Sequence, residues 1–442
     1  MKYVERATRV FLDTGTRFPP RIIWAMGLIK YSAAKVNMEL GLLDEERAKA
    51  IMEAALEVAN GEHNDKIVVD VFQTGSGTGL NMNVNEVIAE RATEIAGVSV
   101  HPNDHVNMAQ SSNDVVPTAI RVAALAEAKE RVAPALKEFI GSLERLASET
   151  LEDVKPGRTH LRDALPVTLG QEIQAYTDAF TKDLELLEST MKLLEEIPLG
   201  GTAVGTGVNA HPDYIARVVE VLSEKTGLPL KPAKSRFRAM RLLTDMASLS
   251  SAYKAIALDL WRLSQDIRLM YSGPNTGISE IDIPQEVPGS SMMPGKVNPV
   301  TVEAALQASA QVIGLDYSNT LAGMLGEFEL SMGIPLMGYN TQVQARLLSE
   351  SLYKMRVLVI DRIKPLKERM QSLAERSQAL ITVVSPIIGY EKAAELSKLM
   401  EKGLTIREAL REIGFTEEEV NRILDLKRLT RPGIPALELK KR

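Results

Sequence analysis

The sequence predicts a mainly α-helical fold with a bundle of long helices at its centre. Apolar side chains recur at steps of three and four in residues 136–146 and 256–270, which is the spacing of one buried helix face. The second segment is apolar around most of its circumference, as helices in the middle of a bundle are. Strand signals are few, and the best candidate, residues 67–72, reads equally well as an extended loop. We therefore expect helices to dominate.

Three regions follow one another along the 442 residues, a length that allows several domains. We expect a mixed, mostly helical N-terminal domain at 1–108, a central long-helix bundle domain at 109–370 and a small helical C-terminal domain at 371–442. The last region is short and charged, and it is interrupted at Gly403. The chain has no internal repeat of fixed period and no low-complexity segment.

The composition argues against several classes of protein. A net charge of −6 makes nucleic acid or an anionic membrane an unfavourable partner. No apolar run reaches membrane-spanning length and the first residues lack the apolar stretch of a signal peptide, so we expect a cytoplasmic protein. The absence of cysteine excludes disulfides and thiol nucleophiles. The five histidines do not follow metalloprotease spacing, so we expect no metal site.

A glycine-rich loop, Thr74–Gly79, precedes a helical pattern that starts near Asn83. Backbone N–H groups in such a loop can surround an anion, and Ser76 and Thr78 would add hydroxyl donors. Two alternatives stay open at this point. One is a plain turn; the other is a dinucleotide-binding fingerprint, although the glycines alternate instead of following the Gly-x-Gly-x-x-Gly pattern.

A second polar segment, Gln110–Asp114, stands before Pro117 and another long helical run. Serine, asparagine and aspartate in this position usually cap the helix. The alternative is a carboxylate clamp in which Ser111, Ser112 and Asn113 act together with the positive end of the helix.

One histidine, His160, lies between polar neighbours and arginines in residues 157–163. Glu303 follows Pro299 at a short distance and is surrounded by apolar residues, where a buried carboxylate needs a partner or a proton. Because the chain has few histidines, we expect His160 to be that partner. Such a dyad would orient the imidazole and raise its basicity, as the activation of a water molecule requires.

The most informative run is residues 289–299, Gly-Ser-Ser-Met-Met-Pro-Gly-Lys-Val-Asn-Pro. It places two hydroxyls, a cation and an amide on a loop that glycine and proline interrupt. Asn298 and Pro299 predict a helix start, with asparagine as the cap and proline in the first position. We therefore expect a mobile loop that leads into a helix N-terminus and can hold a carboxylate while carrying a base.

Taken in order, these runs resemble the class II fumarate hydratases of the fumarase/aspartase superfamily. The match extends from Thr74 to Ala394, and the run at 289–299 is highly specific for the superfamily. Among members of the superfamily, Gly295 and the loop at 74–78 look like those of a fumarase. Aspartases tend to carry alanine at the position before the lysine of the run and at the third position of the glycine-rich loop. The resemblance implies a hydro-lyase of the tricarboxylic acid cycle that hydrates fumarate reversibly to (S)-malate, without a metal or an organic cofactor. It also implies a three-domain subunit and a homotetramer whose active sites combine segments from three subunits.

Residue roles can be carried over from this resemblance. Ser290 would take the proton from C3 of malate, and Lys296 and Asn298 would hold the carboxylate that gains charge. His160 with Glu303 would manage the water that adds to, or leaves from, C2. The residues that would grip the dicarboxylate are Ser76, Thr78, Ser111, Ser112, Asn113 and Thr159.

The sequence departs from the family in two places. The family's auxiliary surface site would comprise His101, Asn103 and Asp104, but the arginine expected before it is replaced around Ser99, which puts anion binding there in doubt. Residues 235–240 also differ from the common Asn-Lys-Phe-Glu version.

Two other functions are considered for the chain. One is an ammonia-lyase that acts on aspartate. The other is a non-catalytic structural protein on the same fold, against which the joint retention of the candidate catalytic residues argues.

Overall fold

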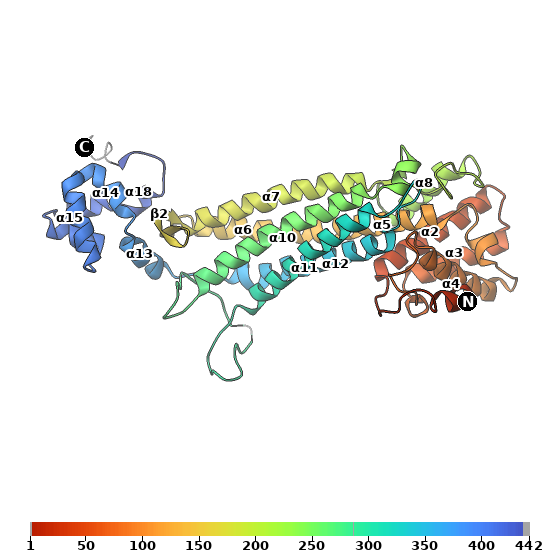
Figure 1. Ribbon diagram of the computed structural model, residues 1–442, viewed down its shortest axis with the longest axis horizontal. Helices are drawn as coiled ribbons and strands as arrows, with labels where there is room; N and C mark the ends of the chain where they lie inside the picture. Colours follow the sequence, from red (N-terminus) through yellow and green to blue (C-terminus); the bar gives the residue numbers. More distant parts are fainter. Residues whose placement is uncertain (1, 286, 436–442) are drawn as a thin grey trace. The chain divides into compact units, whose positions relative to one another are not determined.

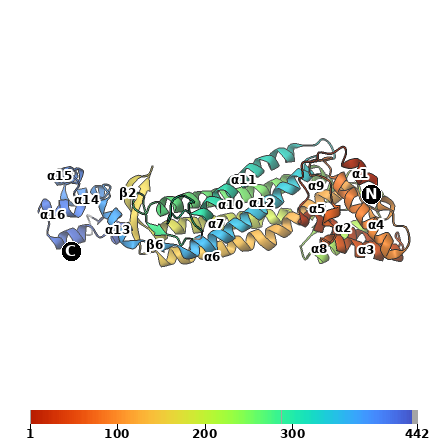
Figure 2. The same cartoon turned by 90° about the horizontal axis from the view of Figure 1, so that it is seen from below.

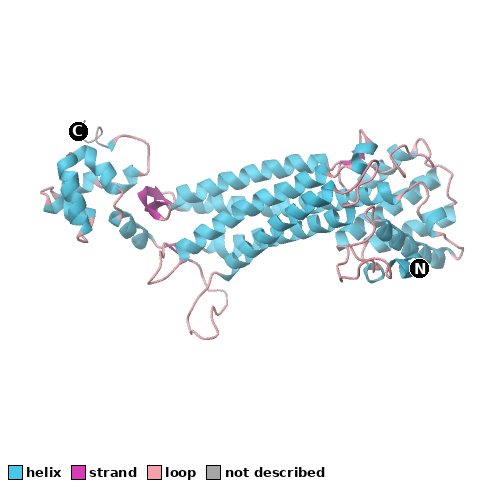
Figure 3. Ribbon diagram, in the orientation of Figure 1, coloured by secondary structure: helices cyan, strands magenta, loops and turns pink. Residues whose placement is uncertain are grey.

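The computed structural model describes residues 2–285 and 287–435, and helices dominate it, as Figure 3 shows. The prediction of a mainly α fold is confirmed. The long helices are α2 (Pro20–Glu39), α3 (Glu45–Ala59), α4 (Thr78–Ala96), α5 (Ser112–Glu127), α6 (Ala133–Glu149), α7 (Leu169–Leu193), α8 (Tyr214–Thr226), α10 (Thr244–Tyr271), α11 (Val300–Met324) and α12 (Ile334–Lys354). The shorter helices are α1 (Lys2–Ala7), α9 (Arg236–Arg241), α13 (Lys367–Arg376), α14 (Leu380–Ile388), α15 (Tyr390–Glu401), α16 (Ile406–Glu412), α17 (Glu417–Ile423) and α18 (Leu426–Leu429).

The described strands are short and pair two by two. They are β1 (Val154–Thr159) with β2 (Arg162–Thr168), β3 (Glu196–Ile197) with β4 (Lys231–Pro232), and β5 (Ile281–Asp282) with β6 (Lys364–Pro365). The first and third pairs are antiparallel, and the second is parallel. None of these strands was predicted from the sequence.

Both predicted apolar faces are buried. In α6 the side chains of Leu136, Phe139 and Leu143 have no exposed surface, and in α10 the same holds for Ile256 and Leu260. Spacing at three and four residues was therefore sufficient to locate these helices and the side that each of them buries.

The chain forms two compact units. The first takes residues 1–136, 182–258 and 307–351, and the second takes 137–181, 259–306 and 352–442. The long helices α6, α7, α10, α11 and α12 each contribute a segment to both units, and within each unit such segments lie side by side (Figures 1 and 2). This division does not test the expected boundaries near 108 and 370, which stay predictions.

In the first unit, α5 is the most deeply buried helix. Every residue of α5 from Asp114 to Glu127 is buried, and α2, α4 and α9 contact it. A helix enclosed on all sides must find internal partners for its charged groups. Arg121 does so: its Nε and Nη2 lie 2.8 and 3.0 Å from the two carboxylate oxygens of Asp245, and neither side chain is exposed. Arg238 on α9 lies 3.6 Å from the same carboxylate, so one residue of the divergent segment 235–240 joins this buried pair.

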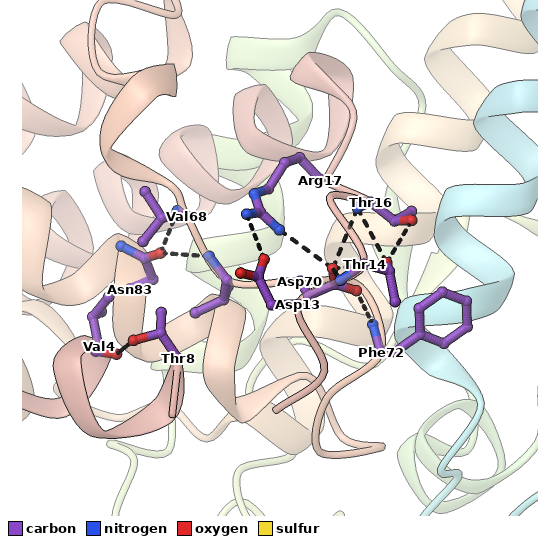
Figure 4. Close-up of polar contacts among 11 residues, drawn as sticks. Val4, Thr8, Asp13, Thr14, Thr16, Arg17, Val68, Asp70, Phe72 and Asn83 are labelled. Atoms are coloured by element: carbon purple, nitrogen blue, oxygen red, sulfur yellow. Dashed lines mark hydrogen bonds and ion pairs between the residues drawn. The ribbon is translucent and has the colours of Figure 1, made fainter. Parts of the chain in front are cut away.

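The strand candidate at residues 67–72 is an extended loop held by one buried carboxylate (Figure 4). Asp70 forms an isolated bridge with Arg17 and accepts hydrogen bonds from the N–H groups of Thr14 and Phe72, at 2.8 and 2.9 Å. Burial alone would raise the pKa of Asp70, but these hydrogen bonds outweigh burial and hold the pKa below its usual value. The loop therefore depends on the ionised carboxylate, not on strand pairing.

The C-terminal helices of the second unit enclose a core of their own. It includes Leu380, Val384, Leu396, Leu410 and Val420, all buried. Two of these helices begin with capping boxes, in which Thr405 and Thr416 exchange hydrogen bonds with Glu408 and Glu419. In the same unit, the hairpin of β1 and β2 packs on α13 and α18.

Within the described residues, none of the helices has the length together with the apolar character that crossing a membrane requires.

Candidate active site

Three of the predicted substrate-binding hydroxyls form a continuous chain in the first unit. The Oγ of Ser76 and the Oγ1 of Thr78 are hydrogen-bonded at 2.8 Å, and Thr78 Oγ1 lies 2.7 Å from the Oγ of Ser112. Ser76 belongs to the loop before α4, Thr78 begins α4, and Ser112 begins α5. Two helix N-termini, each with free backbone N–H groups and a positive partial charge, therefore meet at one cluster of hydroxyls. Such a cluster is suited to a carboxylate.

The glycines of this loop are required by close packing. Gly77 has φ of +78°, and a Cβ placed there would lie 2.6 Å from Cγ1 of Val116 on α5. A Cβ at Gly75 would lie 2.4 Å from the carbonyl oxygen of Met332. The loop follows an extended segment and not a sheet strand, so the structure gives no support to a dinucleotide fingerprint.

We expect Gly77→Ala to lower the free energy of unfolding by roughly 1–3 kcal/mol, because the methyl group overpacks against Val116. Gly97→Ala is the matched control: Gly97 ends the same helix with φ of +68°, but nothing lies within 4 Å of an added Cβ. The control reports backbone strain alone, and urea unfolding of both variants isolates the clash. Equal losses in the two variants would show that Val116 does not constrain the loop.

The segment Gln110–Asp114 caps α5 and also contributes Ser112 to the hydroxyl chain. Ser111 caps α5: its Oγ accepts the N–H of Asn113 at 3.2 Å, and its own N–H donates to Asp114 at 2.9 Å. The other oxygen of Asp114 accepts the N–H groups of Gly200 and Thr202 at 2.9 and 3.0 Å. Burial raises the pKa of Asp114 to about 6, against the effect of these hydrogen bonds. Capping thus occupies Ser111 and Asp114, while Ser112 belongs to the hydroxyl chain.

Thr159 and His160 lie at the tip of the β1–β2 hairpin in the second unit. Thr159 pairs with Arg162, so His160 and Leu161 form a two-residue turn, with φ of +55° and +57°. Turns with positive φ at both positions normally use Asn-Gly or similar residues, and other side chains are strained there. Both Thr159 and His160 are exposed. The missing turn signature explains why sequence reasoning did not find the hairpin, although two strand-like runs do flank His160.

A buried ionic cluster lies directly behind the hairpin tip. Glu280, which has no exposed surface, pairs with Arg158 at 2.8 Å and with Lys155 at 3.1 Å, both on β1. Lys155 also lies 2.6 Å from Glu172 on α7. Burial raises the pKa of Glu172, and the adjacent Lys155 ammonium opposes that effect. Sequence reasoning missed this cluster, because Glu280 lies more than 100 positions from the other members and the four residues have no common pattern.

The loop at residues 289–299 surrounds the candidate base with backbone donors. The Oγ of Ser290 accepts the N–H groups of Met292 and Met293 at 3.2 and 3.0 Å. The loop is closed by the Gly289 N–H, which donates to the carbonyl oxygen of Lys296 at 3.0 Å. Hydrogen bonds to the charged form of a group favour that form, so this arrangement lowers the cost of ionising a serine hydroxyl.

The helix start after this loop differs from the expected one. Helix α11 begins at Val300 and not at Pro299, and the Asn298 side chain donates to the carbonyl oxygen of Gly289 instead of capping the helix. The amide therefore closes the loop across nine residues. Closure also requires Gly289, since a Cβ there would lie 2.4 Å from the Lys296 carbonyl oxygen.

Lys296, Asn298 and Glu303 line one cavity of about 490 Å³ in the second unit, together with Arg268 and Gln265 on α10. Glu303 is half-buried. In the described part of a single chain, His160 and Glu303 make no hydrogen bond or ion pair with each other. The predicted dyad is therefore not formed within one chain, and it stays a prediction for the assembled protein.

His101 caps a short helical turn, Pro102–Val106, which contains the other two auxiliary-site residues, Asn103 and Asp104. His101 Nδ1 accepts the N–H of Asp104 at 3.1 Å, and Asn103 is exposed beside it. His101 and Asn103 also line a cavity of about 1070 Å³ beside α1 and α4. Among the described residues, no three histidine or acidic side chains are grouped to hold a metal ion. The auxiliary site and the absence of a cofactor stay predictions.

The predicted site residues thus fall into two groups. The first unit holds Ser76, Thr78, Ser111, Ser112 and Asn113, and the second holds Thr159, His160, Ser290, Lys296, Asn298 and Glu303.

Comparison with known proteins gives consistent results over nearly the whole chain. A family model described as Lyase matches residues 3–314, and one described as Fumarase C C-terminus matches residues 380–431. The class II fumarate hydratase of Saccharolobus solfataricus is 58% identical over 99% of this chain and 100% of its own length. That of Corynebacterium glutamicum is 45% identical over 96% of this chain and 91% of its own length.

Solved structures agree with the sequence comparison. The class II fumarase of Schistosoma mansoni superposes with a TM-score of 0.91 at 33% identity. A fumarate lyase:delta crystallin from Brucella melitensis superposes with a TM-score of 0.91 at 37% identity. In both comparisons the match covers 97% of this chain and 95% of the other chain.

Proposed function

We infer the function from one premise: the chain belongs to the class II fumarate hydratase family. It is a hydro-lyase that hydrates fumarate to malate reversibly, and it is neither an aspartate ammonia-lyase nor a non-catalytic structural protein. The observation that best supports a catalytic site is the Ser290 hydroxyl, which accepts two backbone N–H groups within the loop that also carries Lys296 and Asn298.

Ser290 would act as the base that removes the proton from C3 of malate. A serine hydroxyl is a poor base at neutral pH, so its alkoxide needs stabilisation before it can act. The N–H groups of Met292 and Met293 already point at its oxygen, and Lys296 adds a positive charge in the same loop. Donors that are in place before the reaction do not have to reorganise during it.

Lys296 and Asn298 would hold the carboxylate next to C3. As the proton leaves, negative charge accumulates on that carboxylate, and the cation and the amide stabilise it more strongly than in the ground state. Both residues line the cavity of the second unit, which is consistent with this role. The hydroxyl chain of Ser76, Thr78 and Ser112, at the two helix N-termini, would bind the remaining carboxylate.

His160 and Glu303 would manage the water at C2. The strained turn presents His160 at an exposed hairpin tip, where it has no hydrogen-bond partner among the described residues. A partner from a neighbouring subunit would orient the imidazole and raise its basicity. We therefore place the His160–Glu303 pair between subunits.

A homotetramer would bring these groups together. In the first unit, α11 exposes Tyr317, Leu321 and Met324 at steps of four and three, with exposed fractions of 69%, 48% and 75%. This spacing is that of a helix face that packs against other helices. Such a face on an isolated subunit favours burial against copies of the same chain.

We expect Leu321→Glu to dissociate the tetramer, because the new charge lies in the centre of this apolar face. Activity should fall at least about tenfold if each site needs several subunits. Leu42→Glu is the matched control, since Leu42 is 47% exposed in the turn between α2 and α3. Light scattering after size-exclusion chromatography gives the mass of each variant. A Leu321→Glu variant that keeps both mass and activity would contradict the proposed interface.

The activity itself is tested with two acids. The purified protein is incubated separately with malate and with aspartate, and the absorbance of the fumarate double bond is followed. We expect fumarate from malate alone. Fumarate from aspartate alone would identify an ammonia-lyase, and turnover of neither acid would indicate a structural protein.

A further inference from the structure

One charged group lies fully buried in the first unit and has no part in the proposed chemistry. Lys30, in the middle of α2, has no exposed surface. Its Nζ donates to Oδ1 of Asn81 at 2.7 Å, to Oδ1 of Asn107 at 3.0 Å and to Oε1 of Gln110 at 2.9 Å. Each of the three ammonium protons is therefore donated to the amide oxygen of a different residue.

Such a group is costly to bury, and an apolar side chain of similar size would avoid that cost. Burial lowers the pKa of Lys30 to about 7, and Asp114 is the charged group that opposes this shift. Three acceptors at close distance offset part of the desolvation cost. The three hydrogen bonds also hold the ammonium at one position between α2, α4 and the loop before α5.

The ammonium determines the orientation of its amide partners. In its protonated form Lys30 can only donate, so each amide turns its oxygen toward Nζ and its NH₂ group away. The NH₂ group of Gln110 then donates to the carbonyl oxygens of Val106 and Met108 at 3.0 and 3.1 Å. That of Asn107 donates to the carbonyl oxygen of Gln110 at 3.2 Å. The backbone of residues 106–110 is thereby held by side chains that Lys30 orients.

Both ends of this network lie within a few residues, along the chain, of the hydroxyl cluster. Gln110 directly precedes Ser111 and Ser112 at the start of α5, and Asn81 lies three residues after Thr78 in α4. Asn81 also donates to Asn107 at 3.1 Å, which links α4 to the loop before α5. The hydrogen bond of 2.7 Å between Thr78 and Ser112 depends on how these two helix starts are placed relative to each other.

We propose that Lys30 is a positioning residue of the dicarboxylate site: its buried ammonium holds the starts of α4 and α5 so that Thr78 and Ser112 bind one carboxylate together. The proposal rests on the function inferred above, in which these hydroxyls contact the substrate. Lys30 itself acts only through Asn81, Asn107 and Gln110.

The test is Lys30→Met, which keeps an unbranched side chain, one atom shorter than that of lysine, and removes the donors. We expect the KM for malate to rise about ten- to a hundredfold, the effect of losing one hydrogen bond to a charged group, with kcat changed less than about threefold. Lys35→Met is the matched control, since Lys35 lies on the same helix, is half-buried and is only 3.9 Å from Glu39. The control should keep the wild-type KM.

If Lys30→Met does not fold, Gln110→Met removes a single acceptor from the network and should raise the KM severalfold. An unchanged KM in a folded Lys30→Met variant of lower stability would overturn the proposal, because Lys30 would then be structural only. A loss confined to kcat would overturn it as well. The wild-type protein is assayed first, so that a failure of the proposed function, with no turnover of malate, is distinguished from a failure of this inference.

Discussion

Ser290→Ala is expected to lower kcat for malate dehydration by roughly 10²–10⁴, the range for loss of an acid–base group. The variant removes the oxygen that accepts the N–H groups of Met292 and Met293, so no alkoxide can form at that place. The loop should still close, since the contacts of Gly289 with Lys296 and Asn298 do not involve the hydroxyl. KM should therefore change less than kcat.

Ser291→Ala is the control for this experiment. Ser291 is the adjacent residue and is exposed, and it has no part in the proposed mechanism. We expect turnover within about threefold of wild type, because exposed substitutions away from functional groups have small effects. Near-normal turnover in Ser290→Ala would remove Ser290 as the base. Steady-state kinetics in both directions, with light scattering to compare the mass of each variant with that of the wild type, provides the measurement.

His160→Asn should lower kcat to a similar extent, roughly 10²–10⁴, because asparagine cannot exchange a proton with water at neutral pH. If both residues serve one proton-transfer sequence, the double variant should lose much less than the product of the two single losses. Multiplicative losses would argue that Ser290 and His160 belong to separate sites.

The largest expected loss of stability is that of Glu280→Gln, at about 3–5 kcal/mol, the range for breaking a buried ion pair by removing one partner. The amide keeps the size of the side chain but leaves Arg158 without its carboxylate and Lys155 with Glu172 alone. Glu185→Gln is the control, because Glu185 pairs with Lys182 at the surface, where both side chains are more than half exposed. An exposed pair of this kind contributes at most about 1 kcal/mol.

Urea unfolding at one fixed protein concentration would compare the two variants, since stability and assembly are linked. The loss should be accompanied by reduced kcat at temperatures where Glu280→Gln is still folded, because β1 carries both Arg158 and the start of the strained turn at His160. Unfolding at the same urea concentration as the control would show that the ionic cluster does not hold the hairpin.

The long helices could be read from the sequence because their signal is local. In α10, Ile256, Leu260, Leu263 and Ile267 are all fully buried, and each step of three or four residues indicates the same face independently of the rest of the chain. The run at 289–299 was equally clear, since its residues act on one another within ten positions. The hydrogen bond of Asn298 could not be predicted in the same way. Whether Asn298 caps α11 or closes the loop depends on where Gly289 lies.

The remaining features depend on contacts between distant segments. The hairpin that carries His160 lacks the usual turn residues, so its strands become evident only where β1 packs on α13 and binds Glu280. Lys30 appears as one more polar residue in a helix until three amides surround it.

The sequence by itself determined the helical class of this protein, the family to which it belongs and the residue types available for the reaction. Only the tertiary structure decided which hydroxyls join into one cluster, which charges are buried and which distant side chains pair with one another. The physical reason is that helix periodicity arises among neighbours along the chain, whereas burial and pairing arise from packing between segments that the sequence separates.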